Sequence, residues 1–150
     1  MSLTHLSLSN VRCFPSLELD LPRQLVVSGA NGSGKSTLIE AISFLALTRS
    51  HRARHDGELI RTPSTAPTSG VQAQGTPEVF PSTATITGRL GPRQILRLAI
   101  TTTGSAVTKQ ASRFGRLSPL SGVVGLVRTV LFTPEELELF TGPPRLRRRL

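Results

Sequence analysis

A glycine-rich loop between two apolar segments constrains this chain more than any other feature. Residues 29–36 fit the pattern Gly-x-x-x-x-Gly-Lys-[Ser/Thr]. The preceding residues 24–28 predict a short buried strand, and residues 37–47 predict a helix. Strand, loop and helix in this order form the setting in which such a loop cradles phosphates, which argues against a chance match in a glycine-rich chain.

Each residue type in the loop has a chemical reason to be there. Glycines let the backbone turn sharply and approach phosphate oxygens, and the N–H groups at the start of the helix attract the anion. Lys35 would reach the β- and γ-phosphates, and the Ser36 hydroxyl would bind Mg²⁺. The loop alone does not choose between ATP and GTP, or between an enzyme, a switch and a clamp. The predicted nucleotide-binding residues are Gly29, Ala30, Asn31, Gly32, Ser33, Gly34, Lys35, Ser36 and Thr37.

Composition adds a strongly basic character. The 150 residues allow one domain at most, and their net charge of +9 comes almost entirely from arginine. Such a charge favours a polyanionic partner, usually nucleic acid; the alternative is that the arginines are spread over a solvated surface. The chain has no Trp or Tyr, so it offers few aromatic platforms on which bases could stack.

Cysteine content and hydropathy bear on the compartment. Cys13 is the only cysteine, which excludes a disulfide or a cysteine-based zinc site within the chain and suits a reducing cytosol. The N-terminus lacks the layout of a signal peptide, and the apolar stretches are too short to cross a bilayer. A cytoplasmic protein without membrane contact is therefore expected.

The remaining patterns predict how the chain is organised. Gly91 and Pro92 supply the turn of a hairpin, residues 56–61 form a turn or short helix, and the Pro-rich residues 62–82 form a mobile loop. Thr133 is expected to cap a helix that runs to about residue 140. Two strands before the phosphate loop differ from the start of GTPases and kinases, and are typical of ABC-type ATPase heads. Strands are predicted at residues 2–10, 16–21, 83–90, 94–101 and 127–132.

Several blocks of residues resemble one family, the RecF family of bacterial recombination and replication-repair ATPases, which are related to SMC heads. The phosphate loop is shared by many families, whereas Ser-His-Arg at 50–52 and Phe-Thr-Pro-Glu-Glu-Leu at 132–137 are more specific. The blocks occur in family order and span nearly the whole chain. They are residues 8–14, 29–47, 48–52, 58–61, 130–139, 142–144 and 147–149.

The resemblance implies a fold and a function. The fold is α/β, a P-loop ABC-type ATPase head of the RecF/SMC type present over residues 1–150 as its N-terminal half, with a mixed sheet that holds antiparallel strands and the P-loop helix. The implied ligands are ATP and Mg²⁺, with Ser36 as the metal ligand. The implied activity is nucleotide-dependent binding to DNA, both single-stranded and at gaps or junctions. The resemblance further implies an ATP-dependent homodimer that works with RecO- and RecR-type mediator proteins in recombinase loading and the SOS response.

The family also suggests roles for three residues outside the loop. By similarity to related heads, Arg12 would lie near the nucleotide, and His51 with Arg52 would communicate between nucleotide and DNA. A structural hydrogen bond is the alternative role for His51.

The chain departs from the family pattern in two places and in length. Residues 62–82 are longer and richer in Pro than the usual connection, and residues 113–115 stand where an Asn-Gly turn is expected, which leaves the register of that hairpin open. The chain stops after its arginine run, where the family continues. Two hypotheses remain: the first half of a DNA-repair ATPase head, or a nucleotide-binding module or nonfunctional fragment without catalysis. An unrelated small kinase is disfavoured by the two early strands.

Catalysis is not expected from these 150 residues alone. ABC-type hydrolysis needs an acid at the end of an apolar strand, and neither Asp20 nor Asp56 follows such a strand. Glu135 is better explained as part of a helix start. Residues 120–123 match the Ser-Gly-Gly motif of a partner head only until Val123, and they predict a turn instead.

Overall fold

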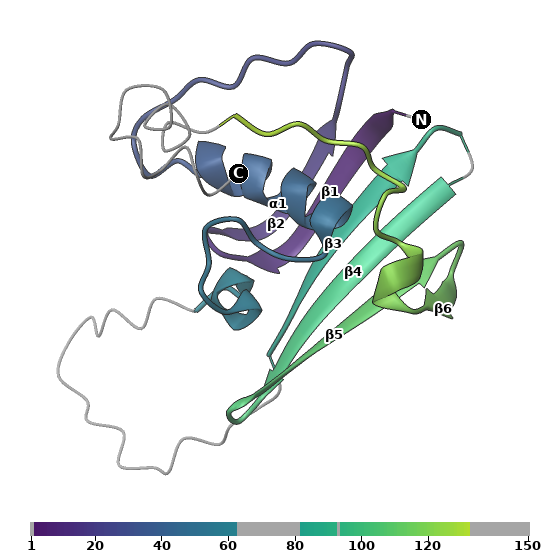
Figure 1. The fold of residues 1–150 in the computed structure, drawn as a ribbon. Coiled ribbons are helices and arrows are strands. Elements are labelled where there is room, and N and C mark those ends of the chain that lie inside the picture. Colours follow the sequence, from purple (N-terminus) through teal and green to yellow (C-terminus); the bar gives the residue numbers. More distant parts are fainter. Residues whose placement is uncertain (1, 63–81, 93, 133–150) are drawn as a thin grey trace, which may run out of the picture.

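A six-stranded antiparallel sheet with one helix across it forms the framework of the protein (Figure 1). The structure is a computed structural model that describes residues 2–62, 82–92 and 94–132. The strand order is β2-β1-β3-β4-β5-β6. The helices are α1 (Lys35–Leu47) and two short 3₁₀ helices, η1 (Asp56–Leu59) and η2 (Leu120–Gly122). The strands are β1 (Leu3–Val11), β2 (Phe14–Asp20), β3 (Ser82–Leu90), β4 (Gln94–Thr103), β5 (Ala106–Arg113) and β6 (Arg116–Ser118).

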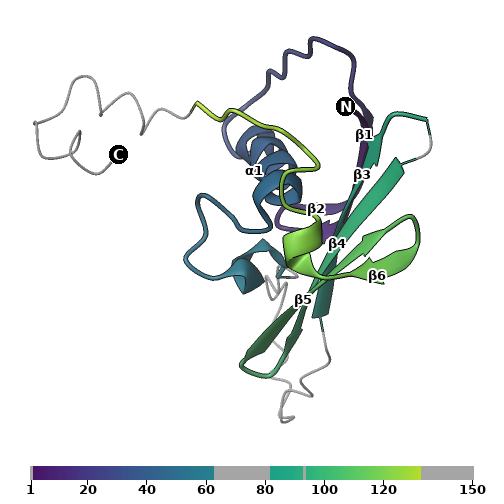
Figure 2. The same cartoon turned by 45° about the vertical axis from the view of Figure 1, so that its right-hand side comes forward.

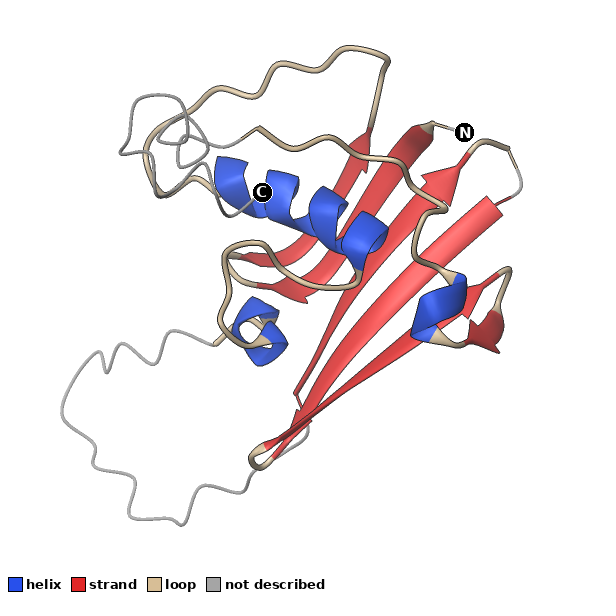
Figure 3. Cartoon of the chain, in the orientation of Figure 1, coloured by secondary structure: helices blue, strands red, loops and turns tan. Residues whose placement is uncertain are grey.

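The two faces of the sheet differ because side chains alternate along each strand. In β3, Ala84, Ile86 and Leu90 are buried on the face that α1 covers, while Thr85 and Thr87 lie on the other face. Figure 2 shows α1 on one side of the sheet, and Figure 3 shows it lying across the central strands. The buried core contains Leu6, Leu8, Phe44, Leu45, Leu59, Ile86, Leu96, Leu98 and Ile100. One covered face thus anchors the helix that begins at the phosphate loop.

The early strands and the central hairpin are confirmed. β1 and β2 match the strands predicted at 2–10 and 16–21, and their register pairs Leu8 with Leu17. β3 and β4 form the predicted hairpin around Gly91, whose φ of 69° suits the turn. η1 confirms the short helix predicted from residue 56, and η2 confirms the turn predicted at residues 120–123.

Two predicted strands are wrong. Residues 24–28 form no strand, and the Val26 side chain is 92% exposed. Residues 127–132 also form no strand, and Phe132 is 84% exposed. Both segments have β-forming side chains, but a strand also needs a neighbour for its N–H and C=O groups, and none pairs with them among the described residues. Every strand pair in this part of the chain is antiparallel, so the parallel component of the expected mixed sheet is not seen here.

Two strands were not predicted. β5 and β6 meet at a tight turn in which Phe114 and Gly115 have φ values of 53° and 75°. Two successive positive φ values are typical of a type I′ hairpin turn, so these residues replace the expected Asn-Gly. β5 was not predicted because most of its residues are polar or exposed.

Two predicted segments lie outside the described residues. They are the loop at 62–82, apart from its end residues, and the helix that begins at Thr133. No helix among the described residues is long and apolar enough to cross a membrane.

Candidate nucleotide site

The phosphate loop reaches α1 through a glycine that no other residue could replace without strain. Gly34 is the N-cap of α1 and has a φ of 97°, in the left-handed region that L side chains rarely adopt. A Cβ at this position would overlap the ring of Phe14 and come within 2.8 Å of the Cys13 Sγ. The start of β2 therefore packs against the loop so closely that only glycine fits.

The start of α1 presents unsatisfied donors. Gly34 makes no side-chain cap, and the first helical bond of the chain runs from the Leu38 N–H to the Gly34 carbonyl at 3.1 Å. The N–H groups before Leu38 have no acceptor within the helix, and the helix dipole adds positive potential there. An anion is the natural partner for these groups.

Lys35 lies across the loop. Its Nζ donates to the carbonyl oxygens of Gly29 and Ala30 at 2.8 and 2.7 Å. An ammonium group has three protons, so one donor remains for a ligand. The Ser33 N–H donates to the Ala30 carbonyl at 3.3 Å and closes the loop on itself. The loop backbone thus holds the lysine charge at the helix start.

A hollow of about 410 Å³ lies at this point, and it collects most of the predicted residues. Gly29, Ala30 and Ser33 do not line it, although the first two hold Lys35. Cys13 lines it as well, a position to which no binding role was assigned. The full lining is Arg12, Cys13, Asn31, Gly32, Gly34, Lys35, Ser36, Thr37 and Arg52.

Behind the hollow lies a buried carboxylate that was not predicted. Glu40 is 0% exposed, and its Oε2 lies 2.7 Å from Arg12 Nε. Arg12 Nη2 donates to Oε1 at 2.8 Å, and the Ser50 hydroxyl donates to the same oxygen. Burial raises the pKa of Glu40, but the hydrogen bonds from Arg12 and Ser50 and the charge of Arg52 outweigh it, so the pKa lies below its usual value. The sequence feature that could have indicated this buried carboxylate is that Glu40 is the one acidic residue of the otherwise largely apolar helix α1.

His51 and Arg52 lie on different sides of the segment that follows α1. Arg52 lines the hollow, and its Nη1 is 3.8 Å from Glu40 Oε2. His51 Nδ1 lies 2.9 Å from the Ser43 Oγ, so His51 has the structural hydrogen bond that was its alternative role. Only Arg52 of this pair is placed beside the phosphate loop.

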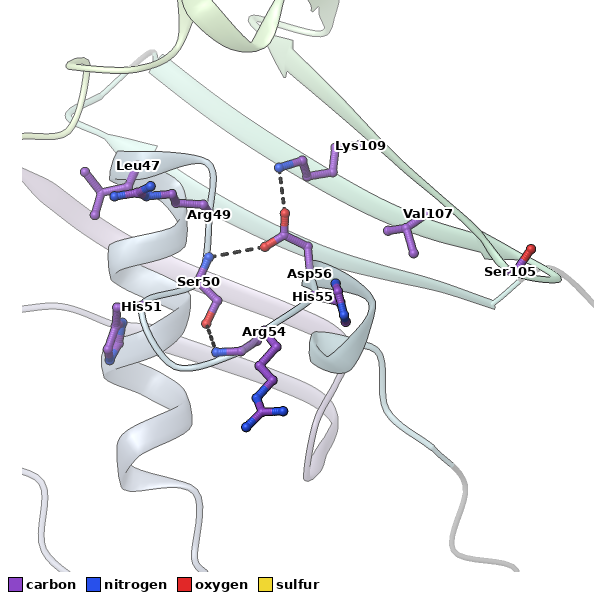
Figure 4. Close-up of a pocket in the computed structure, with 11 residues that line it drawn as sticks. Leu47, Arg49, Ser50, His51, Arg54, His55, Asp56, Ser105, Val107 and Lys109 are labelled. Carbon is purple, nitrogen blue, oxygen red and sulfur yellow. Dashed lines mark hydrogen bonds and ion pairs between the residues drawn. The ribbon is translucent and has the colours of Figure 1, made fainter.

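A second, larger hollow of about 930 Å³ lies between the end of α1, η1 and β5 (Figure 4). Figure 4 shows Lys109 pointing toward Asp56, and their charged atoms are 2.6 Å apart. Arg49 and Arg54 have no carboxylate partner among the described residues. Within the part of the chain that the structure describes, no acidic side chain compensates these two arginine charges of the hollow.

Comparison with known proteins places this geometry in a family. A family model described as AAA domain matches residues 5–109. The chain is 40% identical over 152 residues to DNA replication and repair protein RecF of Thermomicrobium roseum, a match that covers 99% of this chain and 37% of the relative. Proteins of the same name from Lactobacillus acidophilus and Kineococcus radiotolerans are 37% and 38% identical and are covered to 36% and 34%.

Solved structures agree on the fold. The recombination mediator protein RecF, in a structure with ATP described as part of the RecFOR pathway, superposes with a TM-score of 0.68 at 21% identity. This match covers 99% of the chain and 37% of that protein, so the chain spans little more than a third of its relatives. The chain belongs to the AAA domain family, and over nearly its whole length it is similar to the N-terminal part of proteins named RecF.

Proposed function

We propose that this chain is the nucleotide-binding part of a RecF-type DNA replication and repair protein, and that it binds Mg-ATP at the phosphate loop. The observation that carries the proposal is the uncapped start of α1, where Gly34 brings free amides and the Lys35 ammonium to one hollow. ATP is favoured over GTP because a solved relative is described as RecF-ATP. The residues proposed to hold the phosphates are those from Gly29 to Thr37.

The residues present fit a magnesium ion that is bound together with phosphates. The Ser36 side chain is exposed in the hollow and can supply one oxygen ligand. The described residues contain no group of three or more His, Cys, Asp or Glu that could hold a metal by themselves. Mg²⁺ commonly keeps several waters and takes other ligands from the nucleotide, which would supply charge neutralisation at the phosphates.

Replacing the loop lysine tests the nucleotide site. Lys35→Ala should weaken Mg-ATP binding by about 10- to 100-fold, because a charge-assisted contact to phosphate is lost. Isothermal titration calorimetry measures the affinity, and Arg23→Ala removes an exposed cation outside the hollow as the matched control. Equal affinity of wild type and Lys35→Ala would overturn the proposal.

We also propose that the chain contacts DNA through phosphates at the second hollow. The net charge of +9 and the uncompensated Arg49 and Arg54 support this contact, as does the name of the relatives. In the longer protein this contact would serve gapped or junction DNA, within a homodimer that works with RecO- and RecR-type mediators in recombinase loading and the SOS response. The fitting compartment is the cytoplasm.

Salt dependence tests the DNA contact. Arg49→Gln together with Arg54→Gln should lower the slope of log affinity against log salt by about 1 to 2. Fluorescence anisotropy with a gapped duplex measures it, and Arg23→Gln with Arg116→Gln is a control of equal charge change at other exposed positions. The same slope in both double variants would mean that the second hollow is not the contact.

The second candidate function is a nucleotide-binding module without catalysis. It is favoured by the position of the two aspartates, because neither lines the phosphate-loop hollow. Phosphate release by the isolated chain would exclude the module without catalysis, whereas the absence of release agrees with both functions.

A further inference from the structure

The buried carboxylate of Glu40 joins three segments of the chain. Glu40 lies five positions after Lys35 on α1 and is 0% exposed. Its oxygens contact Arg12 from the turn between β1 and β2, and Ser50 and Arg52 from the segment after α1. The Ser50 oxygen also accepts from the N–H groups of Arg52 and Ala53 at 3.0 and 2.9 Å. One carboxylate therefore organises two loops beside the phosphate site.

Arg12 is held at both its backbone and its side chain. Its φ is 46°, and its N–H donates to the Leu59 carbonyl at 2.8 Å, so the backbone is tied to η1. Its Nη2 donates to Glu40 Oε1, and its Nε lies 2.7 Å from Oε2 as an ion-pair contact outside hydrogen-bond geometry, so the guanidinium touches both carboxylate oxygens. The remaining N–H donors of Arg12 have no acceptor among the described residues, and Arg12 lines the phosphate-loop hollow, where they can face a ligand.

Arg52 is held more loosely. It is 49% exposed, and its Nη1 lies 3.8 Å from Glu40 Oε2. It nevertheless lines the same hollow as Arg12, Lys35 and Ser36. The buried carboxylate thus gathers two guanidinium groups at the edge of a site that already has a lysine charge and free amides.

Energetics give a reason for this arrangement. A buried carboxylate is costly to desolvate, and in stability such a pair often gains little over an apolar replacement. An arginine that is fixed before a ligand arrives, as Arg12 is, loses less side-chain entropy on binding than a free one, and Arg52 is confined to a smaller degree. The positive charges of Lys35, Arg12 and Arg52 also repel one another. The Glu40 carboxylate offsets this repulsion because it contacts both arginines.

We infer that Glu40 is a positioning residue, which sets the affinity for nucleoside triphosphate by holding Arg12 and Arg52 at the hollow without touching the ligand. The inference rests on the proposed Mg-ATP site. It gives the carboxylate a role beyond joining loops, because its effect on binding must pass through the two arginines.

A double-mutant cycle tests this inference on the full chain with Mg-ATP as the probe. Glu40→Gln should weaken binding by about 10-fold in the wild-type background and less than about 2-fold when Arg12→Gln and Arg52→Gln are already present. Thermal unfolding is recorded for each variant. Glu18→Gln, on the far face of the sheet, is the matched control and should leave affinity unchanged.

Two outcomes overturn the inference. One is unchanged Mg-ATP affinity in a folded Glu40→Gln variant, and the other is an equal loss in both backgrounds, which describes a purely structural carboxylate. If Glu40→Gln does not fold, Arg12→Lys is measured instead. This variant keeps the positive charge but loses the guanidinium contact with both oxygens of Glu40. Wild-type Mg-ATP affinity of Arg12→Lys would refute the positioning role. A wild type that binds no Mg-ATP, or binds it equally after Lys35→Ala, fails the proposed function instead.

Discussion

His5 forms the centre of an ionic cluster on the face of the sheet that α1 leaves open. Its Nδ1 lies 2.7 Å from Asp20 Oδ1, and its Nε2 lies 2.6 Å from Glu18 Oε2. The hydrogen bonds with Asp20 and then Glu18 raise the pKa of His5 above 6.5. The pKa of Glu18 is lowered by its hydrogen bonds with Ser7 and then His5. Protonated His5 therefore ties β1 to β2.

The stability of the protein should depend on pH through this histidine. Because its pKa is raised on folding, its contribution is fully present below about pH 6.5 and is lost as pH rises through the folded-state value. The unfolding free energies of wild type and His5→Gln should thus differ at pH 6 and converge at higher pH. Urea titrations measure this, and a gap that widens with rising pH would contradict it. Combining Glu18→Gln with Asp20→Asn should remove the pH effect.

At the residue scale, the sequence identifies the loop but not its surroundings. Gly34, Lys35 and Ser36 could be predicted because their chemistry depends on spacing within one local segment. The contact of Glu40 with Arg12 joins positions 28 apart, and no local pattern encodes it. Only the family resemblance placed Arg12 near the nucleotide. Its buried partner, Glu40, could be identified only from the three-dimensional structure.

At the element scale, α1 approaches the sheet closely at Gly88 of β3. A Cβ on Gly88 would come within 2.7 Å of a Leu3 methyl carbon and 2.8 Å of a Leu45 methyl carbon. The φ of this glycine is not positive, so its backbone conformation does not require glycine. Glycine is favoured here because the neighbouring side chains leave no room for a Cβ. The absent side chain lets the phosphate-loop helix lie flat on its strand.

Filling that space should loosen the helix from the sheet. Gly88→Val should lower the free energy of unfolding by about 1 to 3 kcal/mol, because the added side chain would overpack the core between α1 and β3. Thr87→Val is the control, since it places the same residue type on the opposite face of the strand, where a branched side chain is already present. Chemical denaturation measures both, and an equal effect of the two variants would show that α1 does not depend on this contact.

Prediction succeeded for elements whose partner lies next in sequence. The β3–β4 hairpin was predicted because two alternating segments flank a Gly-Pro turn. Residues 24–28 were predicted wrongly because propensity describes the side chains and says nothing of a pairing strand. β5 has the opposite character: its side chains are polar, but β4 pairs along its length, from Leu96 with Arg113 to Thr103 with Ala106.

At the scale of the whole molecule, no carboxylate among the described residues lines the nucleotide hollow, where it could orient water. Asp20 is engaged with His5, and Asp56 with Lys109, so both aspartates of the chain are held elsewhere. The residues that line the hollow are basic, polar or glycine. The charge pattern suits binding of a polyphosphate more than its hydrolysis.

The isolated 150-residue chain should therefore bind Mg-ATP without hydrolysing it. A phosphate-release assay with excess Mg-ATP is expected to show no difference between wild type and Lys35→Ala. Release that requires both Mg²⁺ and Lys35 would refute this expectation and the module without catalysis. Mg-ATP binding is measured in the same sample, because the absence of phosphate release is informative only if the protein binds the nucleotide.

The place of β1 between β2 and β3 has a consequence for the order of folding. β1 pairs with its sequence neighbour β2 on one side and with the distant β3 on the other, where Thr4 Oγ1 donates to the Arg89 carbonyl 85 positions away. Closing a loop of that length costs about 4 kcal/mol of chain entropy before contacts repay it. The phosphate loop and α1 lie inside this loop, so they are confined only when β3 docks. At about 5 to 20 residues per second, synthesis completes β3 about 2 to 8 seconds after Arg52, so we expect α1 to be held against β3 only after that delay.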